Sequence, residues 1–126
     1  MAIELTDLQM SLMRVLWSRG EASVSDVHES AYADRGLALT TVATILTRLE
    51  KAGIVSRRQA GRHYLYRALV SEDEVRRSMV SGLADRLFHG DVTALVSHLL
   101  DDGDIAPGDL DRVRRLIEQK QQHGEG

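Results

Sequence analysis

The hydrophobic period of the chain changes near residue 54, and this change limits the folds that the chain can adopt. Before it, apolar residues recur every three or four positions, which is the spacing of one face of an α-helix. After it, two runs rich in β-branched and aromatic residues, 54–58 and 63–67, indicate strands. The connection from Gln59 to Arg62 contains Gly61, which can adopt a positive φ angle. The two runs therefore predict a β-hairpin.

Three helices are predicted before the hairpin. The first follows the capping residue Thr6, the second follows a capping box from Ser23 to Asp26, and the third spans residues 40–52 and ends before Gly53. Three helices followed by a hairpin is the element order of a winged helix-turn-helix, and residues 1–70 are predicted to form this domain.

Residues 71–126 carry three further apolar stripes at helical spacing. A segment shorter than about 70 residues rarely stabilises a core alone, so we expect it to dimerise. The alternative is that these helices fold back on their own winged domain. The predicted fold is thus mainly α with a small antiparallel β-hairpin: a winged helix-turn-helix followed by a helical dimerisation domain. The residues expected at the dimer interface are Leu83, Leu87, Phe88, Leu95, Val96, Leu99, Leu100, Val113 and Ile117.

The charge of the chain is unevenly distributed. Its net charge is −3, made up of +2 in residues 1–70 and −5 in residues 71–126. Between positions 48 and 67, six cations accompany a single acid, Glu50. Such asymmetry indicates a nucleic-acid surface in the first half, although a solvated basic face would give the same pattern.

The third predicted helix has the residues that a DNA-reading helix needs. Its aliphatic side can anchor it, while Thr40, Thr41 and Thr44 near its N-terminal end can reach base edges in the major groove. A polar helix face without function is the alternative interpretation. The residues predicted to contact phosphate are Arg48, Lys51, Arg57, Arg58, Arg62 and Tyr64.

Other classes of protein fit the sequence less well. The chain has no cysteine, no catalytic motif and no signal or membrane-spanning pattern, so we expect a cytoplasmic protein that is not an enzyme and needs no cofactor or metal. His98 lies near Asp101, Asp102 and Asp104, which would suit an oxygen-rich metal site, but we interpret it as a helix-surface or interface histidine beside a solvated loop. A winged-helix module that binds only protein remains an alternative, against which the basic run argues.

Several segments of the chain resemble the BlaI/MecI/CopY family of penicillinase and copper-response repressors. They are residues 5–17 with a Leu-Trp pair, Val24–Glu29, the threonine-rich run Thr40–Gly53, and Gly61–Tyr66 in the hairpin. The resemblance implies a homodimer that binds a palindromic operator in double-stranded DNA and blocks RNA polymerase.

The resemblance also bears on how repression ends. In the penicillinase branch, a membrane sensor protease system leads to cleavage of the repressor at an Asn-Phe bond in the dimerisation region. The matching pair here is His98-Leu99, which differs from that bond. The copper branch carries a cysteine-rich metal site, and this chain contains no cysteine.

Overall fold

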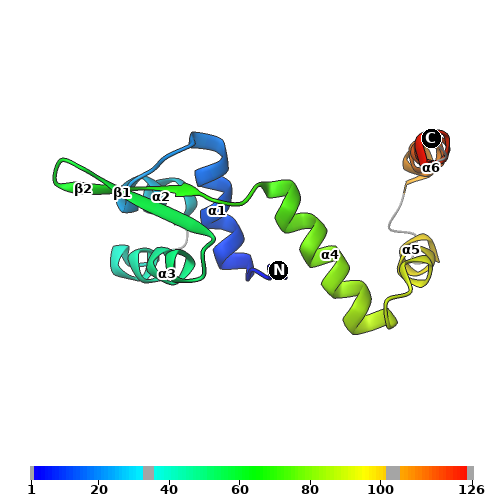
Figure 1. Ribbon diagram of the computed structural model, residues 1–126, viewed down its shortest axis with the longest axis horizontal. Coiled ribbons are helices and arrows are strands. Elements are labelled where there is room, and N and C mark those ends of the chain that lie inside the picture. The colour runs from blue at the N-terminus through cyan, green and yellow to red at the C-terminus, as the bar shows by residue number, and fades with distance from the viewer. Residues whose placement is uncertain (1, 33–35, 102–105, 125–126) are drawn as a thin grey trace. The chain divides into compact units, whose positions relative to one another are not determined.

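The computed structural model describes residues 2–32, 36–101 and 106–124. It divides the chain into two compact units, Met1–Gly82 and Leu83–Gly126, which are described separately below. The first unit contains three helices, a two-stranded antiparallel sheet and the first part of a fourth helix (Figure 1). These elements are α1 (Asp7–Arg19), α2 (Val24–Tyr32), α3 (Leu39–Lys51), β1 (Val55–Ala60), β2 (His63–Ala68) and α4 (Glu72–Phe88).

Helices α1 and α2 begin where their capping residues predict. The Thr6 hydroxyl accepts the backbone N–H of Gln9 at 3.1 Å, and the Gln9 side chain accepts the Thr6 N–H at 2.9 Å. Ser23 and Asp26 form the same reciprocal pair, with both distances 3.1 Å. Each pair satisfies two N–H groups that a helix start leaves free, so the local sequence fixes both starting points.

The hairpin has a shorter turn than the sequence predicted. Ala60 pairs with His63, so Gly61 and Arg62 alone form the connection. Gly61 has a φ of 65°, the left-handed conformation that two-residue hairpin turns require. The predicted four-residue connection from Gln59 to Arg62 is wrong, because the strand ladder continues through Gln59 and Ala60.

The base of the hairpin is attached to the loop between α1 and α2. The N–H of Ala22 donates to the Tyr66 carbonyl at 3.0 Å, and the N–H of Tyr66 donates to the Ala22 carbonyl at 2.8 Å. This isolated bridge adds a third backbone segment beside β2. A two-stranded hairpin alone is only marginally stable, so the bridge stabilises the β1–β2 hairpin, which is the wing of the winged helix-turn-helix.

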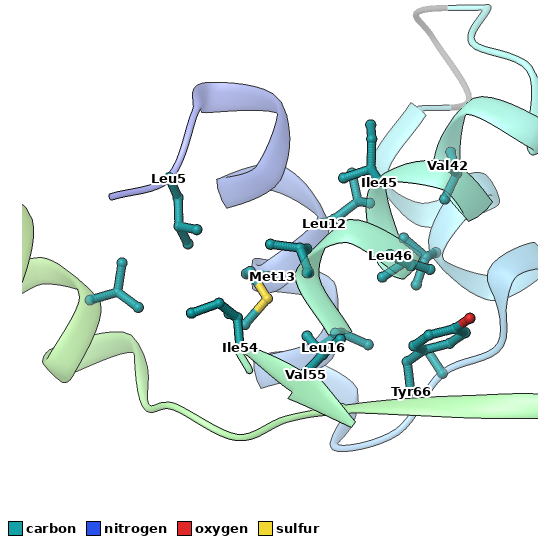
Figure 2. Close-up of a cluster of buried hydrophobic side chains, with 14 of the residues drawn as sticks. Leu5, Leu12, Met13, Leu16, Val42, Ile45, Leu46, Ile54, Val55 and Tyr66 are labelled. Carbon is teal, nitrogen blue, oxygen red and sulfur yellow. The ribbon is translucent and has the colours of Figure 1, made fainter. Parts of the chain in front are cut away.

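The hydrophobic core of the first unit joins α1, α3 and the base of the hairpin (Figure 2). In α3 these side chains come from the apolar stripe that the helical period had indicated, whereas Met13 of α1 and the hairpin residues Ile54, Val55 and Tyr66 add to it. Each fully buried aliphatic side chain contributes roughly 1.5–3 kcal/mol of hydrophobic free energy. The largest of these side chains are Leu12, Met13, Leu16, Val27, Val42, Leu46, Leu49, Val55 and Val75.

The beginning of α4 also belongs to the first unit. Val75 is fully buried in the same core. The Ser78 hydroxyl accepts the N–H of Ile3 at 2.6 Å, and the Trp17 indole N–H donates to the Val70 carbonyl at 2.9 Å. These contacts extend the compact unit to Gly82, beyond the domain boundary predicted at residue 70.

The second unit holds the end of α4, then α5 (Val92–Asp101) and α6 (Pro107–Gly124). The Asp91 carboxylate accepts the N–H of Ala94 at 3.1 Å and so caps the start of α5. Pro107 is the first residue of α6, where its missing N–H costs no hydrogen bond. Within the described ranges, no helix combines the length and apolar character needed to cross a lipid bilayer.

Candidate nucleic-acid interface

Helix α3 separates its two sides sharply. Thr40, Thr41 and Thr44 are exposed, while the opposite side is buried in the core of the first unit, where α3 contacts α2 and β1. The buried side consists of Val42, Ile45, Leu46 and Leu49. With 3.6 residues per turn, the threonines and the two cations Arg48 and Lys51 fall on one face of the helix. The threonine-bearing face is therefore open to a ligand while the aliphatic face is fixed.

The threonine hydroxyls on this face are already oriented. The Thr44 hydroxyl donates to the Thr40 carbonyl at 2.9 Å, and the Thr47 hydroxyl donates to the Ala43 carbonyl at 2.9 Å. Because a hydroxyl has two lone pairs as well as its proton, each oxygen can still accept a hydrogen bond from outside. In the major groove the matching donors are the amino groups of adenine and cytosine, and the threonine methyl can meet the methyl of thymine.

Three predicted phosphate contacts are exposed cations with no ion pair inside the described part of the chain. Arg48 and Lys51 lie in the last turn of α3, and Arg62 lies in the hairpin turn. A cation without a carboxylate partner can bind phosphate at no cost in broken ion pairs. Arg48 and Lys51 therefore add positive charge to the threonine face of α3, and Arg62 adds positive charge at the turn of the hairpin.

Arg57 is held on the side of the hairpin that faces α3. Its Nε lies 3.1 Å from a Glu50 carboxylate oxygen, and its guanidinium lies 4.2 Å from the centre of the Tyr64 ring. A hydrogen bond with the Tyr66 side chain and the charge of Glu50 raise the pKa of Arg57. Tyr64 itself is 43% exposed, so part of its ring remains accessible.

Arg58 forms a bidentate ion pair with Glu21, which precedes α2. Its Nε and Nη2 donate to the two carboxylate oxygens of Glu21 at 2.8 and 2.9 Å. This hydrogen-bonded pairing lowers the pKa of Glu21 and raises the pKa of Arg58. Successive residues of a strand point to opposite faces, so Arg57 and Arg58 lie on different sides of the wing. The sequence prediction had grouped them as one kind of contact.

The outer face of the hairpin combines Arg67, one of the six cations of the basic run, with Ser56, which the sequence analysis had not singled out. Arg67 donates from Nε to the Ser56 hydroxyl at 3.2 Å. Together with Glu21, Arg58 and Leu65, these two residues line a shallow hollow. Glu21 is 37 positions from Arg58 along the chain. No local pattern could have found this pair, because only the tertiary fold brings the two residues together.

The predicted dimer residues of the second unit are mostly exposed in the single chain. The exposed fraction is 63% for Leu87, 45% for Leu99 and 51% for Ile117, and Val96 and Leu100 are also exposed. Leu95 differs, since only 8% of it is exposed. Leu83, Phe88 and Val113 are half-buried. The second unit thus carries apolar side chains that one copy of it leaves uncovered.

His98 lies within α5, where its ring contacts that of Phe88 with 6.0 Å between the ring centres. The pair His98-Leu99, which matches the cleaved bond of the penicillinase branch, is therefore helical. Asp102 and Asp104, two of the three aspartates near His98 in the sequence, lie outside the described residues. No cluster of metal-ligating side chains occurs among the residues that are described.

Comparison with known proteins identifies the family. The sequence model of the penicillinase repressor family matches residues 5–119. The chain belongs to the penicillinase repressor family. The transcriptional regulator BlaI of Mycobacterium tuberculosis (strain H37Rv) is 37% identical over 95% of this chain and 88% of its own length. The methicillin resistance regulatory protein MecI of Staphylococcus aureus (strain N315) is 20% identical, with coverages of 93% and 95%.

Solved structures of this family support the fold. The DNA-binding domain of the repressor BlaI matches with a TM-score of 0.51 and 22% identity, covering 56% of this chain and 87% of that structure. The monomeric form of Bacillus licheniformis BlaI in complex with the blaP half-operator gives the same TM-score and identity, with coverages of 59% and 90%. The predicted winged helix-turn-helix and the predicted family are therefore confirmed, and the chain is a DNA-binding transcriptional repressor.

Proposed function

We propose that this repressor binds a palindromic operator as a homodimer, with α3 in the major groove and the hairpin against the phosphate backbone. The observation that carries the proposal is the exposed threonine face of α3, flanked by unpaired cations and backed by a buried aliphatic side. The Bacillus licheniformis BlaI, whose fold the winged-helix unit shares, was solved with a half-operator.

The residues of the interface divide into two roles. Thr40, Thr41 and Thr44 read base edges, because they lie in the first turns of α3 and their oxygens and methyls match groups in the major groove. Phosphate contacts carry no sequence information and instead fix the position of the protein on the duplex. They come from Arg48, Lys51, Arg62 and Tyr64.

Dimerisation through the second unit follows from its uncovered apolar side chains. Leu87, Leu99 and Ile117 are each at least 45% exposed in one chain, and covering them in a second copy removes apolar surface from water. A two-fold dimer presents two copies of α3 to DNA, about 34–36 Å apart or a multiple of this, which is the repeat of the double helix. A palindromic operator would match this symmetry.

The same proposal covers where the repressor acts and what ends repression. Operator binding requires access to the chromosome, so the proposed place of action is the cytoplasm, and repression by occupying the operator needs no catalytic activity. The family resemblance suggests a membrane sensor protease system as the source of the inducing signal. His98-Leu99 lies in a helix, so cleavage there requires local unwinding of α5 before a protease can bind the extended backbone.

Selection of bound duplexes from a random DNA pool tests the proposal. We expect enrichment of two inverted half-sites with a constant spacing, and an affinity that falls steeply as salt is raised. Enrichment without inverted symmetry would contradict the dimeric operator. If the folded protein retained no duplex at all, the result would favour the alternative of a winged-helix module that binds only protein.

A further inference from the structure

Two successive arginines of β1 are each bound to a carboxylate from a different element of the first unit. Arg57 pairs with Glu50 at 3.1 Å, and Arg58 pairs with Glu21 through two hydrogen bonds of 2.8 and 2.9 Å. Glu50 lies in the last turn of α3, whereas Glu21 lies in the loop between α1 and α2. Each face of the wing is therefore joined by an ion pair to another element of the first unit.

We propose that Glu21 and Glu50 are positioning residues for operator binding, which act through Arg58 and Arg57 to fix the direction of the wing relative to α3. The inference rests on the proposed function, because it assigns a role within the same DNA interface. It changes the assignment of two predicted contacts: Arg57 and Arg58 hold the wing in place instead of binding phosphate themselves.

The geometry of the wing explains why fastening is needed. Six-residue strands are about 20 Å long, so a tilt of roughly 15° at the base displaces the turn by about 5 Å. Such a displacement removes Arg62 in the turn from hydrogen-bonding distance of a phosphate. Beyond the core at Val55 and Tyr66, the described part of the chain resists this tilt through the Ala22–Tyr66 backbone bridge and the two ion pairs.

The bonding of the two guanidiniums also argues against direct phosphate contacts. Arg58 donates from Nε and Nη2 to the two oxygens of Glu21, so a phosphate could form the same pair of parallel hydrogen bonds with these groups only by displacing that carboxylate. Arg57 is held by Glu50 and stacked on Tyr64. A phosphate that displaced either carboxylate would replace one ion pair with another, so it would bring little net free energy of DNA binding. Arg62 has no carboxylate partner in the described ranges, so a phosphate bound there would displace nothing.

Neutralising each glutamate separates the two roles, because they predict opposite changes in affinity. If Arg57 and Arg58 bound phosphate, Glu21→Gln and Glu50→Gln would free a cation, remove a negative charge near DNA and tighten binding. If the glutamates position the wing, the same variants weaken binding. We expect a loss of about fivefold for each, at the upper end of what an exposed ion pair contributes.

The experiment measures the affinity of the full chain for a selected operator duplex and a scrambled duplex by fluorescence anisotropy across a salt series. Glu21→Gln and Glu50→Gln should weaken both duplexes equally and leave the salt slope unchanged. Arg58→Lys should be as weak as Glu21→Gln, because lysine keeps the charge but cannot form two parallel hydrogen bonds. Glu72→Gln is the matched control, since it breaks the exposed Arg76–Glu72 pair on α4, outside the proposed interface.

Two results would overturn the positioning role. One is equal or tighter binding by both glutamine variants, and the other is an unchanged rate of amide exchange at Ala22 and Tyr66 in Glu21→Gln without DNA. The exchange measurement needs no operator, so it tests the fastening even if the wild-type protein binds no duplex. Failure of the wild type to bind any duplex would instead contradict the proposed function.

Discussion

Two substitutions on opposite sides of α3 should separate folding from DNA reading. Leu46 is completely buried, and Thr44, two positions earlier, is exposed. Leu46→Ala removes a buried side chain and leaves a cavity, a change that costs about 3–5 kcal/mol of unfolding free energy. Small domains have only about 5–15 kcal/mol in total, so this loss is a large share. Thr44→Ala should change stability by less than about 0.5 kcal/mol.

The effects on operator selectivity should be reversed. Thr44→Ala removes one hydroxyl and one methyl from the reading face, and losing one base contact costs about 1 kcal/mol of discrimination, or roughly a fivefold ratio. Nonspecific affinity should stay the same, because phosphate contacts are untouched. Leu46→Ala should keep the wild-type selectivity under conditions where it is folded, because its reading face is unchanged.

Urea denaturation and anisotropy titrations with operator and scrambled duplexes measure both quantities on the same samples. Thr44→Val is a useful companion, since it keeps the methyl and replaces the hydroxyl with a second methyl group. An operator-to-scrambled ratio that Thr44→Ala leaves unchanged would refute the assignment of α3 as the reading helix. A loss of stability in Thr44→Ala as large as that in Leu46→Ala would refute the division of α3 into a buried and an open side.

Three further predictions concern the wing, the second unit and the helix caps. Arg62→Ala should weaken binding to all sequences about equally and lower the salt slope by about one, and a loss confined to one base position would show that Arg62 reads sequence. Ile117→Asp should give monomers in sedimentation experiments, because it places a charge on a half-exposed apolar face. It is a better test than a substitution at Leu95, which is buried within one chain. Persistent dimers would contradict the assignment of the second unit as the dimerisation domain. The backbone and side chain of Ser23 lower the pKa of Asp26, so the stability that this carboxylate adds is complete above its unfolded pKa and is lost as the pH falls through the lower folded value. Urea titrations between about pH 6 and pH 3 should therefore show a steeper loss in the wild type than in Asp26→Asn, and equal slopes would exclude the cap as the cause.

Local signals in the sequence were sufficient for the element order of the first unit. Thr6 and Ser23 mark helix starts because a hydroxyl next to free N–H groups is a short-range interaction. Gly61 marks the hairpin turn for a similarly local reason, its positive φ. The buried side of α3 follows from periodicity alone. These features depend on neighbours within a few residues, so they could be predicted without the structure.

Features that depend on distant residues could not be predicted in this way. The burial of Val75, which extends the first unit into α4, depends on how far that helix stays against the core. Arg57 and Arg58 have different carboxylate partners, Glu50 and Glu21, which approach them only in the folded chain. Adjacent like charges in a sequence therefore indicate a charged surface, but the strand pleat places them on opposite faces beside different neighbours.

The hydrogen bond from Trp17 to the Val70 carbonyl has a practical consequence. The chain has a single tryptophan, and it is anchored where α1 meets the segment that leads into α4. Its intrinsic fluorescence will therefore report on the first unit alone, whereas circular dichroism records helix in both units. A gap between the melting curves from these two signals would reveal that the units unfold one after the other, and would assign the earlier step without any label.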